Sequence, residues 1–405
     1  MPDSPELPIE DVQRIVREAR ENGDALRPVG GGVQSSIGSP CARDARLLST
    51  SALTRLVEYS PDDMVVVAQA GVTFGALQAQ LAVSGQWLPI EPALPGRQTL
   101  GGIVATRANS LVRAGYGSVR DWLIGIAVVG GDGELVRGGG KVVKNVSGYD
   151  LPKLYCGSWG TLGVIVETAF KVAPLPQASA TLLAVLPGER NGEAAIEKLL
   201  AAGSPTFAYV FNTDAARVLM GDNADEAQYL AMRFDGPPEA VAMLAARAKE
   251  ALAPVSATVL DLPPALARPL CDALRDFSAG DSELTMRFNV LSSQVGAFAR
   301  MIEWTAAKGG FRAAVVGEGA TGILFARFTP EAGEDARWDG LYALILEKAE
   351  RVGGSFVVER MPEAWRALGS PVWWPMPVDI EIMRGIKKAL DPANLFNPGQ
   401  FVGGI

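Results

Sequence analysis

Apolar and polar positions in the first part of the chain alternate with the periods of helices and strands. The apolar residues between 9 and 19 recur every three or four positions, which predicts a helix with one buried face that Gly23 could end. Thr73 and Thr99 stand directly before two further helical segments, where their hydroxyls can cap the helix. Short apolar runs predict strands at 25–29, 64–68, 124–129, 134–136 and 164–166.

After Pro176 the pattern changes to strand-like runs that alternate with amphipathic helices. The predicted strands are 181–186, 229–234, 284–290, 311–316, 322–328 and 355–360. The predicted helices are 193–201, 238–252, 295–307 and 338–352. The short connections favour an antiparallel sheet with helices on one face, and the Pro-Pro pairs at 237–238 and 263–264 predict turns. The chain therefore has the pattern of an α+β protein.

Glycines gather at separate turns of the first part. Gly30, Gly31 and Gly32 precede Val33-Gln34-Ser35-Ser36, and such a loop can direct several main-chain N–H groups toward a pyrophosphate without Lys or Arg. Thr99 opens a helix next to Gly101 and Gly102, whose free N–H groups also favour an anion. Neither turn has the spacing of the Walker A or Rossmann motif. The alternative is that each glycine only permits a tight turn.

Composition excludes several kinds of site. The 405 residues include no histidine, so no Ser-His pair, His-ligated zinc or His-linked cofactor exists here. The three cysteines, Cys41, Cys156 and Cys271, lie too far apart for a ligand motif, so we predict reduced thiols and no metal site.

A net charge of −8 argues against a nucleic-acid partner. No secretion signal or membrane-spanning run is evident, so we expect a cytoplasmic protein that could meet a membrane only through partners.

Several motifs, in order along the chain, resemble the flavin-binding domain of the vanillyl-alcohol oxidase / p-cresol methylhydroxylase superfamily. They are Arg27–Gly32, Leu100–Thr106, Tyr116-Gly117, Lys144–Leu151 and Gly157–Gly163. Within the superfamily the pattern looks most like the glycolate oxidase D and E subunits and the D-2-hydroxyacid dehydrogenases. Asp391–Gly399 is similar to the closing motif of that branch.

The resemblance implies a two-part FAD-binding (PCMH-type) domain over residues 1–176 and an antiparallel α+β cap domain over 177–375. Residues 376–405 would return to the FAD-binding domain. The resemblance also implies FAD as the cofactor, bound by Pro28, Gly30, Gly31, Gly32, Val33, Gln34, Ser35, Ser36, Pro95, Thr99, Leu100, Gly101, Gly102, Ala105, Thr106, Gly160, Gly163, Val164 and Asn397. Because there is no histidine and 94–102 holds no cysteine, we predict non-covalent FAD. Cys156 is a core thiol in this interpretation, rather than a flavin link.

The cap domain departs from the D-2-hydroxyacid dehydrogenases, in which histidines hold a metal and accept the substrate proton. Here Glu318 lies in the comparable stretch, and Arg360 follows Glu359 where a histidine is expected. Oxidation of a 2-hydroxy acid needs a base for the hydroxyl proton and a cation for the carboxylate. The candidates are Glu318 or Glu359 as base and Arg287 as carboxylate anchor. Ordinary ion pairs are the alternative for all three.

A cap without histidine resembles the E subunit of glycolate oxidase. The resemblance implies a complex with a D-type flavoprotein subunit, which would oxidise the small 2-hydroxy acid glycolate to glyoxylate, and an iron–sulfur F-type subunit. One alternative is a free-standing FAD-dependent D-2-hydroxyacid dehydrogenase. Another is a structural subunit with a vestigial flavin site. A reductase of UDP-N-acetylenolpyruvylglucosamine fits the tail and length less well.

Overall fold

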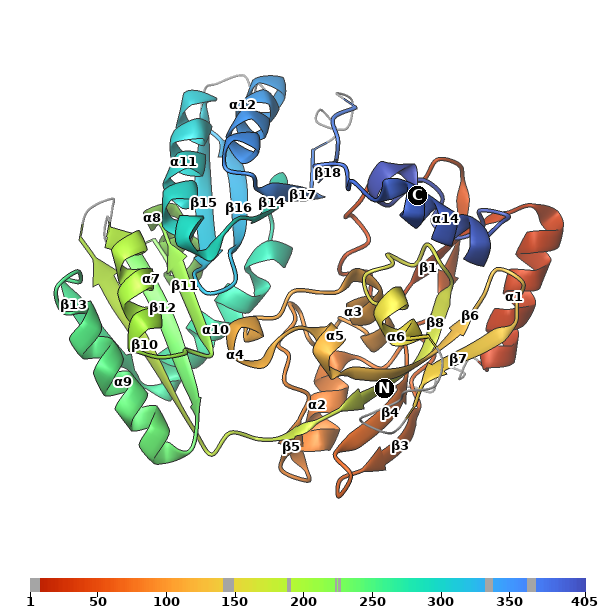
Figure 1. Ribbon diagram of the computed structural model, residues 1–405, viewed down its shortest axis with the longest axis horizontal. Coiled ribbons are helices and arrows are strands. Elements are labelled where there is room, and N and C mark those ends of the chain that lie inside the picture. The colour runs from red at the N-terminus through yellow and green to blue at the C-terminus, as the bar shows by residue number, and fades with distance from the viewer. Residues whose placement is uncertain are drawn as a thin grey trace. The chain divides into compact units, whose positions relative to one another are not determined.

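The computed structural model describes residues 8–140, 149–187, 191–222, 224, 227–331, 338–362 and 369–405. The chain divides into two compact units (Figure 1). The first unit comprises the residues up to Ser110, Ser118–Leu175 and Met376–Ile405, and the second comprises Leu111–Gly117 and Pro176–Pro375. The predicted α+β class is confirmed. Residues 144–148 of the motif that begins at Lys144 lie outside the described residues.

The first unit is built on a five-stranded antiparallel sheet. In spatial order its strands are β3 (Leu56–Ser60), β4 (Val65–Gln69), β8 (Val164–Lys171), β6 (Leu123–Val129) and β7 (Leu135–Gly139). Two smaller pairs accompany it: parallel β1 (Ala25–Val29) with β2 (Ala45–Ser49), and antiparallel β5 (Gln86–Trp87) with β9 (Ala173–Pro174). Phe396 bridges to Leu26, so the C-terminal segment runs parallel to β1.

Helices cover both faces of this sheet. They are α1 (Ile9–Asn22), α2 (Phe74–Ala82), α3 (Leu100–Thr106), α5 (Val119–Trp122), α6 (Leu151–Tyr155) and α14 (Ile380–Leu390), followed by a short 3-10 turn, Val402–Gly404. One apolar core lies under α2 and α3, and a second lies between α1 and the sheet. Successive residues of β6, such as Val128 and Val129, enter opposite cores. This two-sided burial explains why the strand is apolar throughout.

Three of the predicted helix ends in the first unit are confirmed. Gly23 follows α1 with φ of 74°, in the left-handed region that glycine adopts readily. The Thr73 hydroxyl accepts a hydrogen bond from Ala76 N at 3.3 Å, at the start of α2. The Thr99 hydroxyl accepts from Gly102 N at 3.3 Å, at the start of α3. Short polar side chains before an apolar helical pattern therefore predicted these boundaries correctly.

The second unit contains a nine-stranded sheet whose pairs are all antiparallel. In spatial order the strands are β13 (Thr258–Leu262), β10 (Ala178–Leu186), β12 (Gln228–Gly236), β11 (Phe207–Phe211), β15 (Phe311–Glu318), β16 (Ile323–Pro330), β14 (Leu284–Asn289), β17 (Ser355–Arg360) and β18 (Trp373–Trp374). Its helices are α4 (Arg113–Tyr116), α7 (Asn191–Ala202), α8 (Thr213–Met220), α9 (Pro238–Leu252), α10 (Pro264–Asp276), α11 (Val295–Lys308) and α12 (Trp338–Arg351), with 3-10 turns at Phe277–Ala279 and Ser292–Gln294.

The expectation of helices on one face of this sheet was wrong. Helices α7, α9, α11 and α12 share one apolar core with the sheet, whereas α8 and α10 contribute to a separate core. Neighbouring residues of β16, Leu324 and Phe325, enter these two cores alternately, so the cores lie on opposite faces. Pro263 and Pro264, taken for a turn, begin α10, because the fixed φ of proline suits the first turn of a helix.

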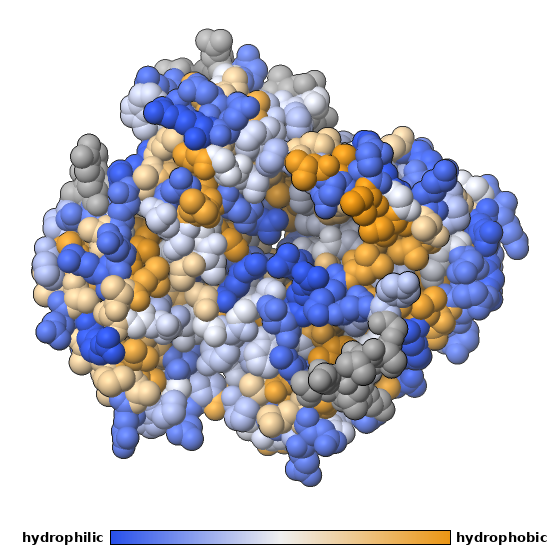
Figure 2. Space-filling model, in the orientation of Figure 1, coloured by the Kyte–Doolittle hydropathy of each residue, from blue (hydrophilic) through white to orange (hydrophobic). Residues whose placement is uncertain are grey.

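Helix α14 docks on the first unit mainly through polar contacts. Lys387 is its one buried residue, while Ile386 and Leu390 are partly buried against the apolar core. Figure 2 shows apolar surface gathered over α14, and the side chains of Met376, Val378 and Ile382 in this segment are exposed. Apolar burial therefore contributes little to holding this helix.

Candidate cofactor site

A cavity in the first unit is lined by the predicted glycine-rich turns. Its walls are the loop after β1, the segment that enters α3, the turn before β8 and two residues of the C-terminal segment, Asn397 and Gln400. All the predicted cofactor residues line it except Ser36, Pro95 and Leu100. Leu100 is fully buried in the core under α3 instead.

Sequence reasoning missed part of the lining, namely Arg27, Val29, Thr50, Gln98, Trp159, Ile165 and Gln400. Most of these directly adjoin a predicted residue and could have been found by widening each motif by one position. Thr50 and Gln400 carry no such local signal, since only the fold brings them to the cavity.

Two of the turns approach each other so closely that only glycine fits between them. A Cβ atom on Gly31 would lie 1.7 Å from the carbonyl oxygen of Arg97. A Cβ atom on Gly30 would lie 2.1 Å from Oγ1 of Thr99. Gly32 adds a positive φ of 70°, which other residues rarely adopt. The glycines thus form a narrow main-chain cradle.

The main-chain N–H groups of this cradle are free to bind a ligand. Within the described part of the chain, the N–H groups of residues 30–34 donate no hydrogen bond. An unpaired N–H group costs free energy unless water or a ligand accepts from it. Consecutive N–H donors in a concave loop are the usual protein site for phosphate oxygens. The loop therefore has the donors that a diphosphate needs.

The expectation that the N–H groups at the start of α3 are free was wrong, although Thr99, Gly101 and Gly102 do line the cavity. The N–H groups of Leu100 and Gly101 donate to main-chain carbonyl oxygens at 2.9 and 2.8 Å, and that of Gly102 donates to Thr99. These donors are therefore occupied by the protein. A cation is present instead, because Arg27 lines the cavity and its guanidinium donates to the Ser35 carbonyl.

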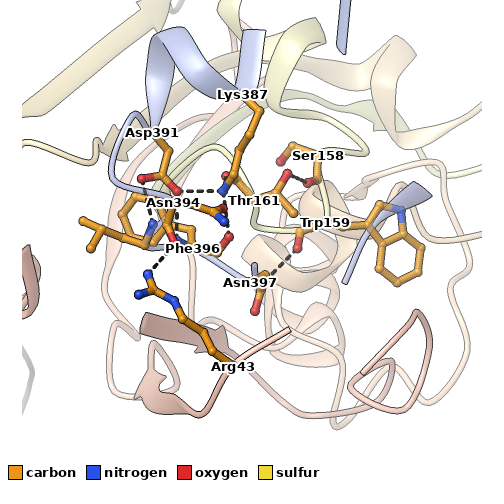
Figure 3. A network of polar contacts seen from close by, with 10 residues as sticks. Arg43, Ser158, Trp159, Thr161, Lys387, Asp391, Asn394, Phe396 and Asn397 are labelled. Atoms are coloured by element: carbon orange, nitrogen blue, oxygen red, sulfur yellow. Dashed lines mark hydrogen bonds and ion pairs between the residues drawn. The ribbon is translucent and has the colours of Figure 1, made fainter. Parts of the chain in front are cut away.

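Buried side-chain acceptors complete the cavity. Asn397 donates from Nδ2 to the Trp159 carbonyl at 2.8 Å, which leaves its Oδ1 without a partner (Figure 3). Gln98 donates from Nε2 to Oε1 of Gln34 at 3.3 Å, and its own Oε1 likewise has no partner. Both side chains are at most 4% exposed. Such atoms call for a ligand with O–H or N–H donors.

Free N–H donors, unpaired acceptors and a cation together fit FAD. FAD carries diphosphate oxygens that accept hydrogen bonds, and its ribityl hydroxyls and flavin imide can donate them. The described lining contains neither cysteine nor histidine. Cys156 lies in the core under α3, and burial raises the pKa of its thiol to about 11. A thiol with this pKa is almost entirely un-ionised at neutral pH and is a poor nucleophile.

The candidate catalytic residues lie in the second unit, where the structure brings two of them together. Arg287 on β14 places its Nε 3.4 Å from Oε1 of Glu359 on β17. Glu359 is 9% exposed, and burial raises the pKa of its carboxyl group while the Arg287 cation lowers it. A buried carboxylate beside a cation is an arrangement that can accept a proton and hold an anion.

Glu318 is separated from that pair. It ends β15, and β16 lies between β15 and β14 in the sheet. Its carboxylate accepts hydrogen bonds from Ala208 N at 3.0 Å and Thr321 N at 2.6 Å. Burial raises the pKa of Glu318, and these hydrogen bonds lower it. The carboxylate therefore supports the β15–β16 turn.

The described residues offer neither a metal site nor a membrane-spanning helix. No group of three or more His, Cys, Asp or Glu side chains in this part of the chain could hold a metal ion. No helix in it is long and apolar enough to cross a membrane.

Comparison with protein families defines the class. Residues 8–139 match the family described as FAD binding domain, and residues 376–401 match the C-terminal domain of FAD linked oxidases. Both matched regions are those of FAD-linked enzymes, and FAD is the cofactor of this chain. The predicted family resemblance is confirmed.

The relatives narrow the class. D-2-hydroxyglutarate dehydrogenase of Xanthomonas citri pv. viticola is 29% identical, over 97% of this chain and 87% of the relative. Glycolate oxidase subunit GlcD of Bacillus subtilis is 26% identical, over 99% of this chain and 89% of the relative. Glycolate oxidase subunit GlcE of Escherichia coli is 43% identical, over 31% of this chain and 37% of the relative. The likeness to GlcE is stronger but covers less of the chain.

Solved structures share the fold. A 4-ethylphenol oxidase from Gulosibacter chungangensis matches with a TM-score of 0.76 at 18% identity, over 97% of this chain and 87% of that one. p-Cresol methylhydroxylase matches with a TM-score of 0.75 at 15% identity, with the same coverage. At these identities the match concerns the fold alone.

Proposed function

We propose that this chain is the FAD-binding, E-type subunit of a glycolate oxidase complex. In that complex a D-type flavoprotein subunit oxidises glycolate to glyoxylate, and an iron–sulfur F-type subunit receives the electrons. The first unit is the FAD-binding domain, and the second unit is the cap domain. The 43% identity to GlcE and the lack of histidine support the E-type assignment.

The glycine cradle is the observation that carries this proposal. Its free N–H groups at residues 30–34 would hold the diphosphate, and the unpaired oxygens of Gln98 and Asn397 would accept hydrogen bonds from donor groups of FAD. When bound, FAD would give this subunit a group that can take up and release electrons within the complex. Because the described lining offers no Cys or His, the cofactor is held without a covalent link.

Purification of the full chain tests the FAD site. We expect a yellow protein with close to one FAD per chain, released intact by acid. A colourless protein that takes up no added FAD would end the proposal. Co-expression with D-type and F-type subunits should then give a stable complex, and this chain by itself should leave its flavin oxidised when glycolate is added.

The Arg287–Glu359 pair favours a second function, a free-standing D-2-hydroxyacid dehydrogenase. In this mechanism Arg287 would hold the substrate carboxylate and Glu359 would accept the hydroxyl proton, and bound FAD would supply the two-electron acceptor. The 87% coverage of a D-2-hydroxyglutarate dehydrogenase is compatible with it. Glu318 is left out of this mechanism because its oxygens serve the β15–β16 turn.

Stopped-flow reduction of the flavin separates the two functions. The isolated chain is mixed with glycolate, D-lactate or D-2-hydroxyglutarate without oxygen. Rapid bleaching that Glu359→Gln abolishes would establish the free-standing dehydrogenase. No bleaching, together with turnover of the assembled complex that needs bound FAD in this chain, supports the subunit. Turnover that survives removal of this FAD would instead mark the flavin site as vestigial.

A further inference from the structure

Lys387 connects three segments of the first unit from a buried position. Its Nζ donates to the carboxylate of Asp391 at 2.7 Å, to the Thr161 carbonyl at 2.8 Å and to the Phe396 carbonyl at 2.9 Å (Figure 3). An ammonium group has three donors, and all three are used here. The residue is 7% exposed. Lys387 is therefore a connecting residue with no donor left for a ligand.

Asp391 collects donors from the same segments. Its carboxylate accepts from Leu395 N and Phe396 N, both at 2.9 Å, as well as from Lys387. Asp391 is 1% exposed. Burial lowers the pKa of Lys387, and the bond to Asp391 raises it, so each charge compensates the other. The Lys387 ammonium group and the Asp391 carboxylate therefore both have their hydrogen-bond partners within the protein.

Both segments that the pair holds continue directly into the cavity wall. Phe396 directly precedes Asn397, which lines the cavity. Thr161 lies between Gly160 and Gly163, which also line it. Asn397 has a positive φ of 44° and fastens the same two segments again through its bond to Trp159. The polar network thus sets the distance between the C-terminal segment and the turn before β8.

We propose that Lys387 and Asp391 are positioning residues that pre-form this wall of the FAD cavity. The inference rests on the proposed binding of FAD by this cavity and names the residues that set its affinity. Neither residue of the pair lines the cavity. The pair acts by holding Asn397 and the turn from Gly160 to Gly163 in their binding arrangement before FAD enters.

Lys387→Met tests the proposal, with two control variants. This change removes the cation but keeps most of the side-chain volume, and we expect the dissociation constant of FAD to rise about tenfold or more. Lys388→Met changes the neighbouring exposed lysine of α14 and should leave the constant unchanged. Leu81→Ala destabilises the same unit through its apolar core, away from the cavity lining. It should lower the melting temperature without the loss of FAD affinity.

The outcomes are distinct. An unchanged FAD constant in Lys387→Met, or a change no larger than in Leu81→Ala, would overturn the positioning role. A parent protein that binds no FAD would instead overturn the proposed function and leave the variants without a constant to compare.

Hydrogen exchange of the parent protein keeps the inference testable if Lys387→Met does not fold. Without FAD, the amides of Leu395 and Phe396 should already exchange slowly, whereas those of residues 30–34 should become slow only when FAD is added. Rapid exchange at Leu395 and Phe396 until FAD is added would show that the wall is not pre-formed.

Discussion

The two units carry their chemistry in different ways. The cavity of the first unit is made of short continuous segments, in which neighbouring residues such as Gly30, Gly31 and Gly32 contribute main-chain groups. The Arg287–Glu359 pair of the second unit joins side chains from two strands that are far apart in the sequence. Main-chain sites leave a local glycine pattern, while side-chain pairs depend on how strands align.

Strand alignment in the second unit includes an irregularity that no local pattern shows. Thr285 pairs with Arg360, but the next residue, Met286, pairs with Val358, so Glu359 is the extra residue of a bulge. Such a bulge redirects the side chain that it displaces. Arg360, the residue at the expected histidine position, pairs with Thr285 in the strand register and is not part of the Arg287–Glu359 pair.

The largest effect should come from closing the cradle. Gly31→Val places side-chain atoms where the Arg97 carbonyl lies, so we expect FAD affinity to fall on the order of 100-fold or more. Gly96→Val is the matched control, because a Cβ atom there meets nothing within 4 Å. Flavin fluorescence titration measures both constants. A Gly31→Val protein that is purified with a full complement of FAD would contradict the cradle.

Breaking the side-chain pair should have the next largest effect. Arg287→Met leaves Glu359 buried without its cation and should lower the free energy of unfolding by about 3 kcal/mol. The FAD content should not change, since the cavity residues belong to the first unit. Urea unfolding measures the loss, and Arg287→Met combined with Glu359→Leu should recover much of it.

The pH dependence of this loss has a defined sign. Burial raises the pKa of Glu359 in the folded protein, and removal of Arg287 raises it further. A carboxyl group with a raised pKa favours folding at low pH, and this contribution is lost as the pH rises through the folded-state pKa. The free energy of unfolding of Arg287→Met should therefore be closest to that of the parent in acid, and the difference should grow as the pH increases. A constant difference across the pH range would contradict the burial of an unpaired Glu359.

A smaller loss of stability is expected from substitution of Glu318. Glu318→Gln replaces one accepting oxygen by an NH₂ group facing an N–H donor, which should cost about 1 kcal/mol of stability. Flavin reduction by any 2-hydroxy acid should not change. If Glu318→Gln lost flavin reduction while Glu359→Gln kept it, Glu318 would be the base and Glu359 would have a structural role.

The smallest effect should come from the buried thiol of the first unit. Cys156→Ala should leave the FAD content unchanged and the FAD extractable by acid. In the parent, a pKa of about 11 should make Cys156 unreactive to alkylation at neutral pH, while Cys41 and Cys271, which are partly exposed, react first. Mass spectrometry of peptides measures this order. Flavin that stays attached to a peptide with Cys156 would contradict the non-covalent site.

Local patterns were sufficient for many elements. The helices after Thr73 and Thr99 and the strand at 25–29 follow from capping and period alone. They were insufficient for α8, α10 and α14, which sequence reasoning did not predict. Helix α14 shows why: its one buried residue is Lys387, and a lysine inside a helix is normally read as exposed.

Three properties follow from the residues alone: histidine chemistry is absent, the glycine loop after residue 29 suits a diphosphate, and the fold is α+β. These are properties of composition and of neighbouring residues, whose physical causes act over a few positions. Two features depend on the folded protein: the first N–H groups of α3 donate to carbonyl oxygens of other segments, and Glu359 pairs with Arg287. The tertiary structure also decided that Lys387 and Asp391 secure the cavity wall. Each of these depends on contacts between distant segments, for which burial and strand alignment, rather than local preference, set the partners.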